Sequence, residues 1–260
     1  MAEQSAPTPR DLAEPTWSAG GVRLLDVDPE LGAELGPEAF ADVQRQLVLP
    51  TLQLEKGGWD RTWLGSARGV RGKPRGFLVV AGAVSVDLAI AGQACTRMIT
   101  TRELVLLDGW VQDSIPVRTG WSVLDQARIA VLDERLGIIG RRWPELMSAI
   151  LERAAQQIRH ALLQQAISQL PRVEDRLLAL LWSIADRQGV VRRDGVWVHL
   201  PVTHATLAQM IGARRPTVSL GLRALAERGH VRSIDGGWLI SRDSIEVFPD
   251  PESTPDVVGD

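Results

Sequence analysis

Residues 203–225 read THATLAQMIGARRPTVSLGLRAL. Apolar residues recur three and four positions apart in two groups, Leu207, Met210, Ile211 and Val218, Leu222, Leu225, so the spacing predicts two helices that each bury one stripe. Thr203 can cap the first helix, Gly212 can take the left-handed conformation that ends it, and Pro216 is tolerated in the opening turn of the second. Two short helices that share a tight corner form a helix-turn-helix.

The second predicted helix begins with side chains suited to reading DNA. Arg214 and Arg215 supply forked N–H donors, and Thr217 and Ser219 supply hydroxyls, at the end that would enter a major groove. The alternative is a buried helical hairpin with a solvated arginine pair. The surrounding sequence favours DNA.

From about residue 171 to residue 240 the chain resembles the winged helix-turn-helix of the Crp/Fnr family of bacterial transcription regulators. The matching parts, in order, are a helix over 173–187, a hairpin over 190–201, the stretch 203–225 and two short strands around an Asp235-Gly236 turn. The last hairpin would be the wing. The resemblance implies a ligand-sensing β-roll upstream and a long dimerisation helix, in an α+β chain.

Length and composition are those of an ordinary globular protein. With 260 residues, 45% of them hydrophobic and 23% charged, the chain is long enough for two domains. Apolar runs fall short of the ~20 residues of a membrane helix, and the first residues lack a signal-peptide layout, so we expect a cytoplasmic protein without a membrane partner. A lone Cys95 excludes an internal disulfide and a cysteine-only metal cluster.

The net charge of −3 hides an asymmetry. Between Arg172 and Arg242 there are eleven Arg against six acids, a local balance of +5, which suits a DNA-binding domain over 170–242. Residues 243–260 carry six acids and no base, and we expect an acidic disordered tail there. Residues 1–20 are expected to be a flexible leader.

Over residues 21–140, short apolar runs separated by Gly predict a jelly-roll-like β-roll. Residues 76–88 resemble the family's central hairpin, in which a Gly turn follows an apolar strand. The tryptophans of this region either fill the core, which we favour, or line an apolar effector pocket; they are Trp59, Trp63, Trp110 and Trp121.

The effector site of the family is degenerate in this sequence. In the nucleotide-binding members a Gly-Glu pair heads a short helix, and an Arg further on meets the cyclic phosphate. Arg118 and Thr119 resemble that Arg step, but the Gly-Glu pair is absent and the interval is short. Because a buried phosphate needs several donors, we expect no control by cyclic AMP or cyclic GMP. A cyclic-nucleotide-responsive regulator that uses Arg118 is the alternative; the small-molecule effector is otherwise unknown.

All four histidines lie at or beyond residue 160, so the roll has no imidazole to hold a metal or haem or to act as a base. We therefore expect no metal, no cofactor and no enzymatic activity.

Residues 141–169 resemble the family's dimerisation helix. A seam of Met147, Leu151, Ala154 and Ile158, continued by Ala161 and Gln165, recurs at steps of four and three, as in a coiled coil. The alternative is that this stripe packs on its own roll.

We therefore predict a homodimeric transcription regulator that binds an inverted repeat in double-stranded DNA, with RNA polymerase as a further partner. Arg215 is expected to read a guanine, Thr217 and Ser219 to touch base edges or phosphate, and Thr203, His204 and Arg232 to contact the DNA backbone. Pro216 and Leu220 replace an acidic residue and an Arg of the family's pattern, so the half-site should differ. A protein–protein module that no longer reads DNA is the alternative.

Overall fold

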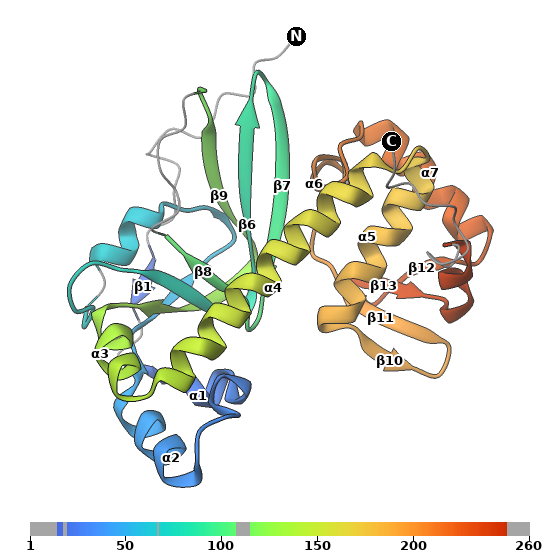
Figure 1. Ribbon diagram of the computed structural model, residues 1–260. Coiled ribbons are helices and arrows are strands. Elements are labelled where there is room, and N and C mark those ends of the chain that lie inside the picture. Colours follow the sequence, from blue (N-terminus) through green and yellow to red (C-terminus); the bar gives the residue numbers. More distant parts are fainter. Residues whose placement is uncertain (1–14, 18–19, 67, 108–114, 249–260) are drawn as a thin grey trace, which may run out of the picture. The chain divides into compact units, whose positions relative to one another are not determined.

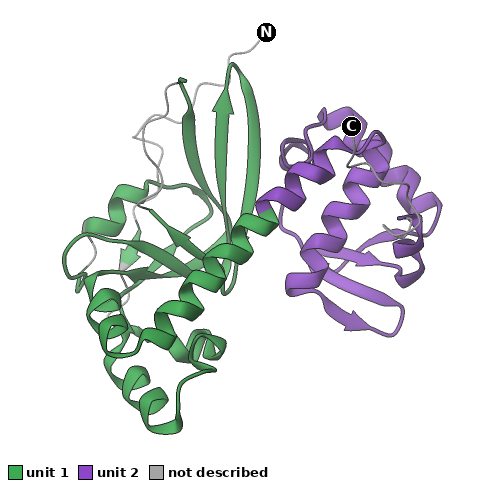
Figure 2. Cartoon of the chain, in the orientation of Figure 1, with its two compact units in different colours: residues 1–160 green, residues 161–260 purple. Residues whose placement is uncertain are grey.

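The computed structural model describes residues 15–17, 20–66, 68–107 and 115–248. The chain divides into two compact units, residues 1–160 and residues 161–260 (Figure 2). Unit 1 is rich in strands and unit 2 contains the helix-turn-helix, so the predicted α+β class is confirmed.

Unit 1 is built on a seven-stranded antiparallel sheet. Its two longest strands, β6 (Gly76–Ile90) and β9 (Arg118–Leu132), pair along most of their length (Figure 1). The strand order in this sheet is β1 (Thr16–Trp17), β4 (Thr51–Leu54), β9, β6, β7 (Gln93–Thr100). Two short strands complete it: β5 (Gly57–Gly58) pairs with β9, and β8 (Leu104–Leu106) pairs with β6. A separate pair joins β2 (Val22–Arg23) to β3 (Val48–Leu49).

The predicted hairpin over residues 76–88 is wrong, because β6 runs through this segment without a turn. Gly82, with φ +79°, lies at irregularities in the register between β6 and β9. A positive φ in a strand is typical of a bulge, which bends the strand and does not reverse it. The chain reverses at Ala91 and Gly92, both with positive φ, where a two-residue turn joins β6 to β7.

Helices flank this sheet in unit 1. They are α1 (Leu24–Val27), η2 (Pro29–Gly32), α2 (Pro37–Gln46), η3 (Arg61–Ser66), α3 (Glu134–Arg142) and the first part of α4 (Pro144–Gln169). Helix α2 begins at Pro37, which is tolerated in the first turn of a helix. Helix α3 begins within residues 21–140, for which a β-roll was predicted. Asp133 caps this helix by accepting a hydrogen bond from the Arg135 N–H. Pro144 occupies the first position of α4, where the missing N–H group costs no hydrogen bond within the helix.

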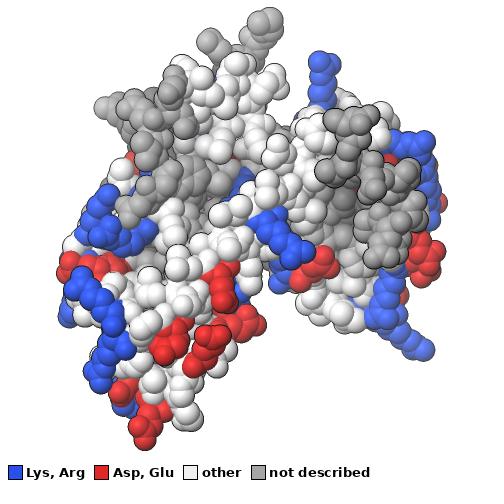
Figure 3. Space-filling view, in the orientation of Figure 1, with Lys and Arg blue, Asp and Glu red and all other residues white. Residues whose placement is uncertain are grey.

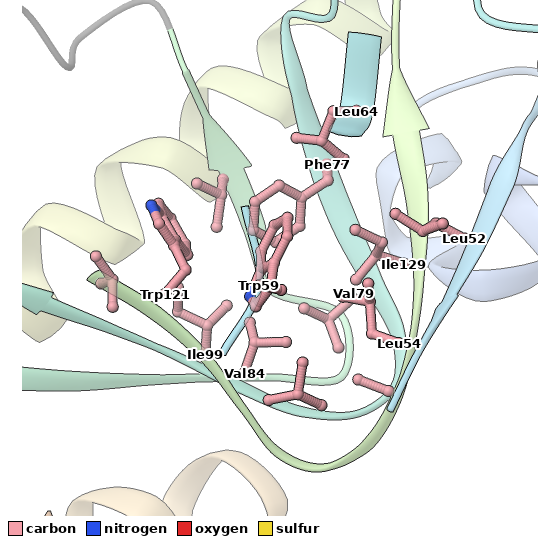
Figure 4. Close-up of a cluster of buried hydrophobic side chains, with 14 of the residues drawn as sticks. Leu52, Leu54, Trp59, Leu64, Phe77, Val79, Val84, Ile99, Trp121 and Ile129 are labelled. Carbon is pink, nitrogen blue, oxygen red and sulfur yellow. The ribbon is translucent and has the colours of Figure 1, made fainter. Parts of the chain in front are cut away.

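Two buried clusters hold unit 1 together. In the first, Trp59, Phe77 and Trp121 pack edge to face, with ring centroids 5.5–5.8 Å apart (Figure 4). In the second, α4 contributes Leu146 and Ile150. Trp59 and Trp121 are therefore core residues and Trp63 packs beside them, whereas Trp110 lies outside the described residues.

Unit 2 combines helices with a four-stranded antiparallel sheet. Its helices are α5 (Val173–Gln188), α6 (His204–Met210) and α7 (Arg215–Glu227), and the sheet order is β10 (Val190–Arg192), β11 (Gly195–His199), β13 (Gly237–Ile240), β12 (Val231–Ile234). The helix expected over 173–187 and the turn at Asp235-Gly236 are both present.

Short segments within the expected leader and tail form secondary structure. Within the expected leader, β1 pairs with β4. Within the expected tail, η4 (Arg242–Val247) is a 3₁₀ helix in which Ser244 is buried and accepts a hydrogen bond from Trp182 Nε1 at 3.0 Å. Disorder from residue 243 is therefore wrong for residues 243–247; residues 1–14, 18–19 and 249–260 lie outside the described part. Among the described residues, helices are too short or too polar to cross a membrane.

Candidate nucleic-acid interface

Local capping fixes the corner between α6 and α7. The Thr203 hydroxyl oxygen accepts a hydrogen bond from the Thr206 N–H at 3.1 Å and so caps α6. Gly212 takes φ +63° just after α6, and Pro216 lies in the first turn of α7. These three predictions from the sequence are confirmed. They give α7 a defined starting point at Arg215.

The buried face of α7 fixes which side chains face outward. Val218, Leu222 and Leu225 are buried, as the spacing predicted. Gly221 lies against α5, where an added Cβ would come 2.9 Å from Leu177 Cδ1. Because this side of α7 packs in the core, the opposite side faces solvent.

A residue that sequence reasoning missed supports the corner from α5. The guanidinium of Arg176 donates hydrogen bonds to the carbonyl oxygens of Leu170, Ile211 and Gly212. Carbonyl groups at the end of a helix have no N–H donor within the helix. The guanidinium of this arginine supplies donors for them. Its partners at the α6–α7 corner lie 35 and 36 positions away in the sequence, and local spacing carries no signal for such contacts.

The N-terminal end of α7 presents the predicted DNA-contacting side chains. Arg214, Arg215, Thr217 and Ser219 are all exposed. Within the described residues, Arg214 and Arg215 form no salt bridge, so their guanidinium groups face water. A helix N-terminus carries a partial positive charge, which adds to that of the two arginines and attracts phosphate.

The structure brings His204 to the same surface. Its ring Nδ1 lies 2.9 Å from Ser219 Oγ, and that hydroxyl also donates a hydrogen bond to the Arg215 carbonyl oxygen at 3.2 Å. The first turn of α6 is thereby linked to the second turn of α7. Thr203, His204 and Ser219 are exposed, so all three can also meet a ligand at this surface.

The four-stranded sheet of unit 2 carries two further arginines that are paired with carboxylates. Arg232 on β12 lies 2.6 Å from Asp194, and Arg192 on β10 lies 3.2 Å from Asp235. Such exposed pairs are weak and are easily exchanged for a phosphate. On the face shown in Figure 3, basic and acidic side chains are interspersed over unit 2.

The predicted dimer seam lies beside the face of α4 that packs within unit 1. That inward face consists of Leu146 and Ile150, followed by Arg153, which pairs with buried Asp28 at 2.7 Å, and Gln157, which donates to the Leu104 carbonyl. Of the seam residues, Met147 and Ala154 are half-buried, whereas Leu151 and Ile158 are 64% and 65% exposed.

The predicted effector residues lie at the beginning of β9. Arg118 pairs with Ala89 and Thr119 with Leu88 in the β6–β9 ladder, and both side chains are exposed. The segment just before them, residues 108–114, lies outside the described part. The described residues contain no group of three or more His, Cys, Asp and Glu side chains arranged to hold a metal ion.

Comparison with known protein families agrees with the helix-turn-helix found in unit 2. Residues 175–244 match the Crp-like helix-turn-helix domain. No curated protein sequence matches the chain.

Several solved structures share the fold. A cyclic nucleotide-binding domain containing protein from Listeria monocytogenes EGD-e has a TM-score of 0.61 and 15% identity over 84% of this chain and 98% of that one. FixK2 from Bradyrhizobium japonicum has a TM-score of 0.58 and 14% identity, with coverage of 77% and 96%. The transcriptional regulator TTHB099 of the CRP family, from Thermus thermophilus, has a TM-score of 0.52 and 19% identity, with coverage of 75% and 93%.

Proposed function

Because residues 175–244 form a Crp-like helix-turn-helix domain on a chain with the fold of Crp/Fnr transcription regulators, we propose that the protein is a sequence-specific DNA-binding transcription regulator that acts as a homodimer in the cytoplasm. The observation that carries this proposal is the exposed N-terminal end of α7. Two exposed arginines and two exposed hydroxyl side chains lie there on a helix whose opposite face is fixed by the core.

Each side chain has a distinct role in the proposal. Arg215, in the first turn of α7, donates two hydrogen bonds to the O6 and N7 atoms of a guanine, and Thr217 and Ser219 contact base edges or phosphate. Arg214, Thr203, His204 and Arg232 contact the phosphate backbone and set the register of the protein on DNA. In a two-fold symmetric dimer, two α7 helices enter successive major grooves, so the operator is an inverted repeat. Once bound, the dimer acts through contact with RNA polymerase.

The direct test is selection from a library of random DNA duplexes, followed by titration of the selected operator. We expect an inverted repeat with a guanine in each half-site. Arg215→Ala should weaken specific binding by about 1–3 kcal/mol, because a bidentate base contact is lost from an exposed position that does not support the fold. Binding to non-specific DNA should change much less.

A matched control is Arg228→Ala, which removes an exposed arginine at the other end of α7. This variant should bind the operator within a factor of about two of the wild type, since exposed charges distant from the bases contribute weakly. Equal binding by Arg215→Ala and the wild type would remove Arg215 from the reading site. Failure to enrich any duplex would favour a protein–protein module.

We also infer that cyclic nucleotides do not control this protein. Arg118 is exposed and the Gly-Glu pair is absent from the sequence, whereas a cyclic phosphate in a partly buried pocket must be met by several donors at once. Isothermal titration calorimetry with cyclic AMP and cyclic GMP should give no saturable isotherm at micromolar concentration. A near-stoichiometric isotherm that disappears in Arg118→Ala would restore the nucleotide sensor.

A further inference from the structure

Leu220 is 68% exposed in the second turn of α7. At 100° per residue, this position lies about 140–160° around the helix from the buried residues Val218, Leu222 and Leu225, so the side chain is directed away from the core of unit 2. A single exposed leucine on an ordinary surface needs no explanation. Here it lies at the centre of the face that the proposed function directs toward DNA.

Over the first two turns of α7, the side chains directed furthest from the core form an apolar line, because Leu220 follows another apolar residue on the same face. Pro216, one turn earlier, is exposed and has neither an N–H group nor a polar side chain. One turn later, the charged residue Arg223 ends this apolar line; it forms an exposed ion pair with Glu227, with Nε 2.8 Å from Oε1. The polar side chains Arg215 and Ser219 lie beside this line. A groove would therefore receive hydrogen-bonding groups at the side of the helix and an aliphatic group at its centre.

The major groove offers one aliphatic partner. Base pairs present hydrogen-bond donors and acceptors along the groove, and the only apolar group among them is the C5-methyl group of thymine. A polar base edge pressed against the Leu220 side chain would lose its contact with water and gain no hydrogen bond in return. A thymine methyl group would instead bury apolar surface against it.

We propose that Leu220 is a specificity-determining residue that selects thymine in each half-site by contact with its C5-methyl group. The inference rests on the proposed function, because it requires α7 to enter the major groove. Leu220 lies five residues after Arg215, about 7.5 Å along the helix axis, so the selected thymine lies within roughly two base pairs of the guanine that Arg215 reads.

The test uses the full-length protein and its selected operator. Each half-site thymine is replaced in turn, in both half-sites, by deoxyuridine, which removes only the methyl group and keeps the base pair. Wild-type protein should lose about fourfold in affinity per half-site at one thymine position, the loss expected for one buried methyl group. Leu220→Ala should bind the thymine operator more weakly than the wild type and should show no loss on deoxyuridine replacement at that position. Leu220→Met, which keeps an aliphatic side chain, should retain the sensitivity.

Val191→Ala is the matched control, since Val191 is 69% exposed on β10 of the same unit. It should bind and discriminate like the wild type. If the wild type binds its operator specifically but tolerates deoxyuridine at every position, or if Leu220→Ala keeps the wild-type sensitivity, the inference is wrong and the proposed function survives. If the wild type selects no sequence at all, the proposed function and the inference fall together.

Discussion

At the scale of single residues, Asp133 is a buried charge of unit 1 with several hydrogen-bond donors around it. It is fully buried, caps α3 and accepts hydrogen bonds from the Arg71 N–H at 2.7 Å and from the Arg135 guanidinium at 2.6 Å. Burial alone would raise the pKa of Asp133, but the hydrogen bonds from Arg135 and Arg71 outweigh it and lower that pKa below its ordinary value. The carboxylate therefore joins the loop around Arg71 to the beginning of α3.

We expect Asp133→Asn to lower the free energy of unfolding by about 3 kcal/mol at pH 7, because it removes one partner of a buried ion pair. The folded pKa of Asp133 is depressed, so its stabilisation is complete above the unfolded carboxyl pKa of about 4 and is lost as the pH falls through the folded value. The difference between the variant and the wild type should thus be constant above about pH 5 and shrink below about pH 4. Urea unfolding followed by tryptophan fluorescence measures it.

Glu34→Gln is the control, since Glu34 is an exposed carboxylate in the turn between η2 and α2. Its effect should stay within about 0.5 kcal/mol at every pH. A destabilisation by Asp133→Asn that does not change between pH 7 and pH 3 would mean that the charge of Asp133 contributes little and that the capping geometry alone matters.

Single residues with local roles could be predicted from the sequence. Thr203, Gly212 and Pro216 act on backbone within four positions of themselves, and each was placed correctly. Arg135 and Arg176 could not be predicted, because the former donates to the Val48 carbonyl, 87 positions away, and the latter to carbonyls at the α6–α7 corner. Contacts at such separations depend on the finished fold.

At the scale of elements, the bulge in β6 depends on Gly82. Its φ of +79° is unfavourable for residues with a side chain, and a Cβ placed there would lie 2.1 Å from the Gln126 carbonyl oxygen on β9. Gly82→Ala therefore combines backbone strain with a clash between two central strands, and we expect it to lower the free energy of unfolding by about 3 kcal/mol or more. Urea unfolding monitored by circular dichroism is the measurement.

Gly92 provides a closely matched control. It has the same φ of +79°, but a Cβ placed there would have open space among the described residues. Gly92→Ala should cost about 1 kcal/mol, the strain term alone. Similar costs for the two variants would show that the clash with Gln126 is relieved by a small shift of the strands.

The elements of unit 2 were predicted better than those of unit 1 for a physical reason. In unit 2 each helix shows its apolar period and its caps in one short segment, and the Asp235-Gly236 turn fixes the wing hairpin locally. In unit 1, Gly82 gives the same sequence signal whether it forms a turn or a bulge, and only the partner strand β9 decides between them. Helix α3 was assigned partly to the roll because its short apolar groups, Leu136 and Ile138-Ile139, resemble the preceding strands.

At the scale of the whole molecule, α4 carries a line of apolar side chains that are exposed to solvent. Leu151, Ile158 and Leu162 are each at least 60% exposed, at steps of seven and four residues. This is the spacing of a coiled-coil seam, and it lies beside the inward face made by Leu146 and Ile150. Met147 packs against the second buried cluster, so the alternative that the stripe packs on its own roll describes this residue.

We therefore predict that Ile158→Asp converts a dimer into a monomer. In a parallel two-stranded seam, Ile158 meets its symmetry mate, so the substitution places two carboxylates against each other in an apolar interface, where neither charge is compensated. Ile138→Asp is the control, because Ile138 is 59% exposed on α3 and is not part of the α4 seam. Sedimentation velocity should give a dimer for the wild type and for Ile138→Asp, and a folded monomer for Ile158→Asp. Operator affinity should then fall steeply only in the seam variant, because a single α7 reaches only one half-site. An Ile158→Asp protein that sediments as a dimer would place the dimer contact elsewhere on the molecule.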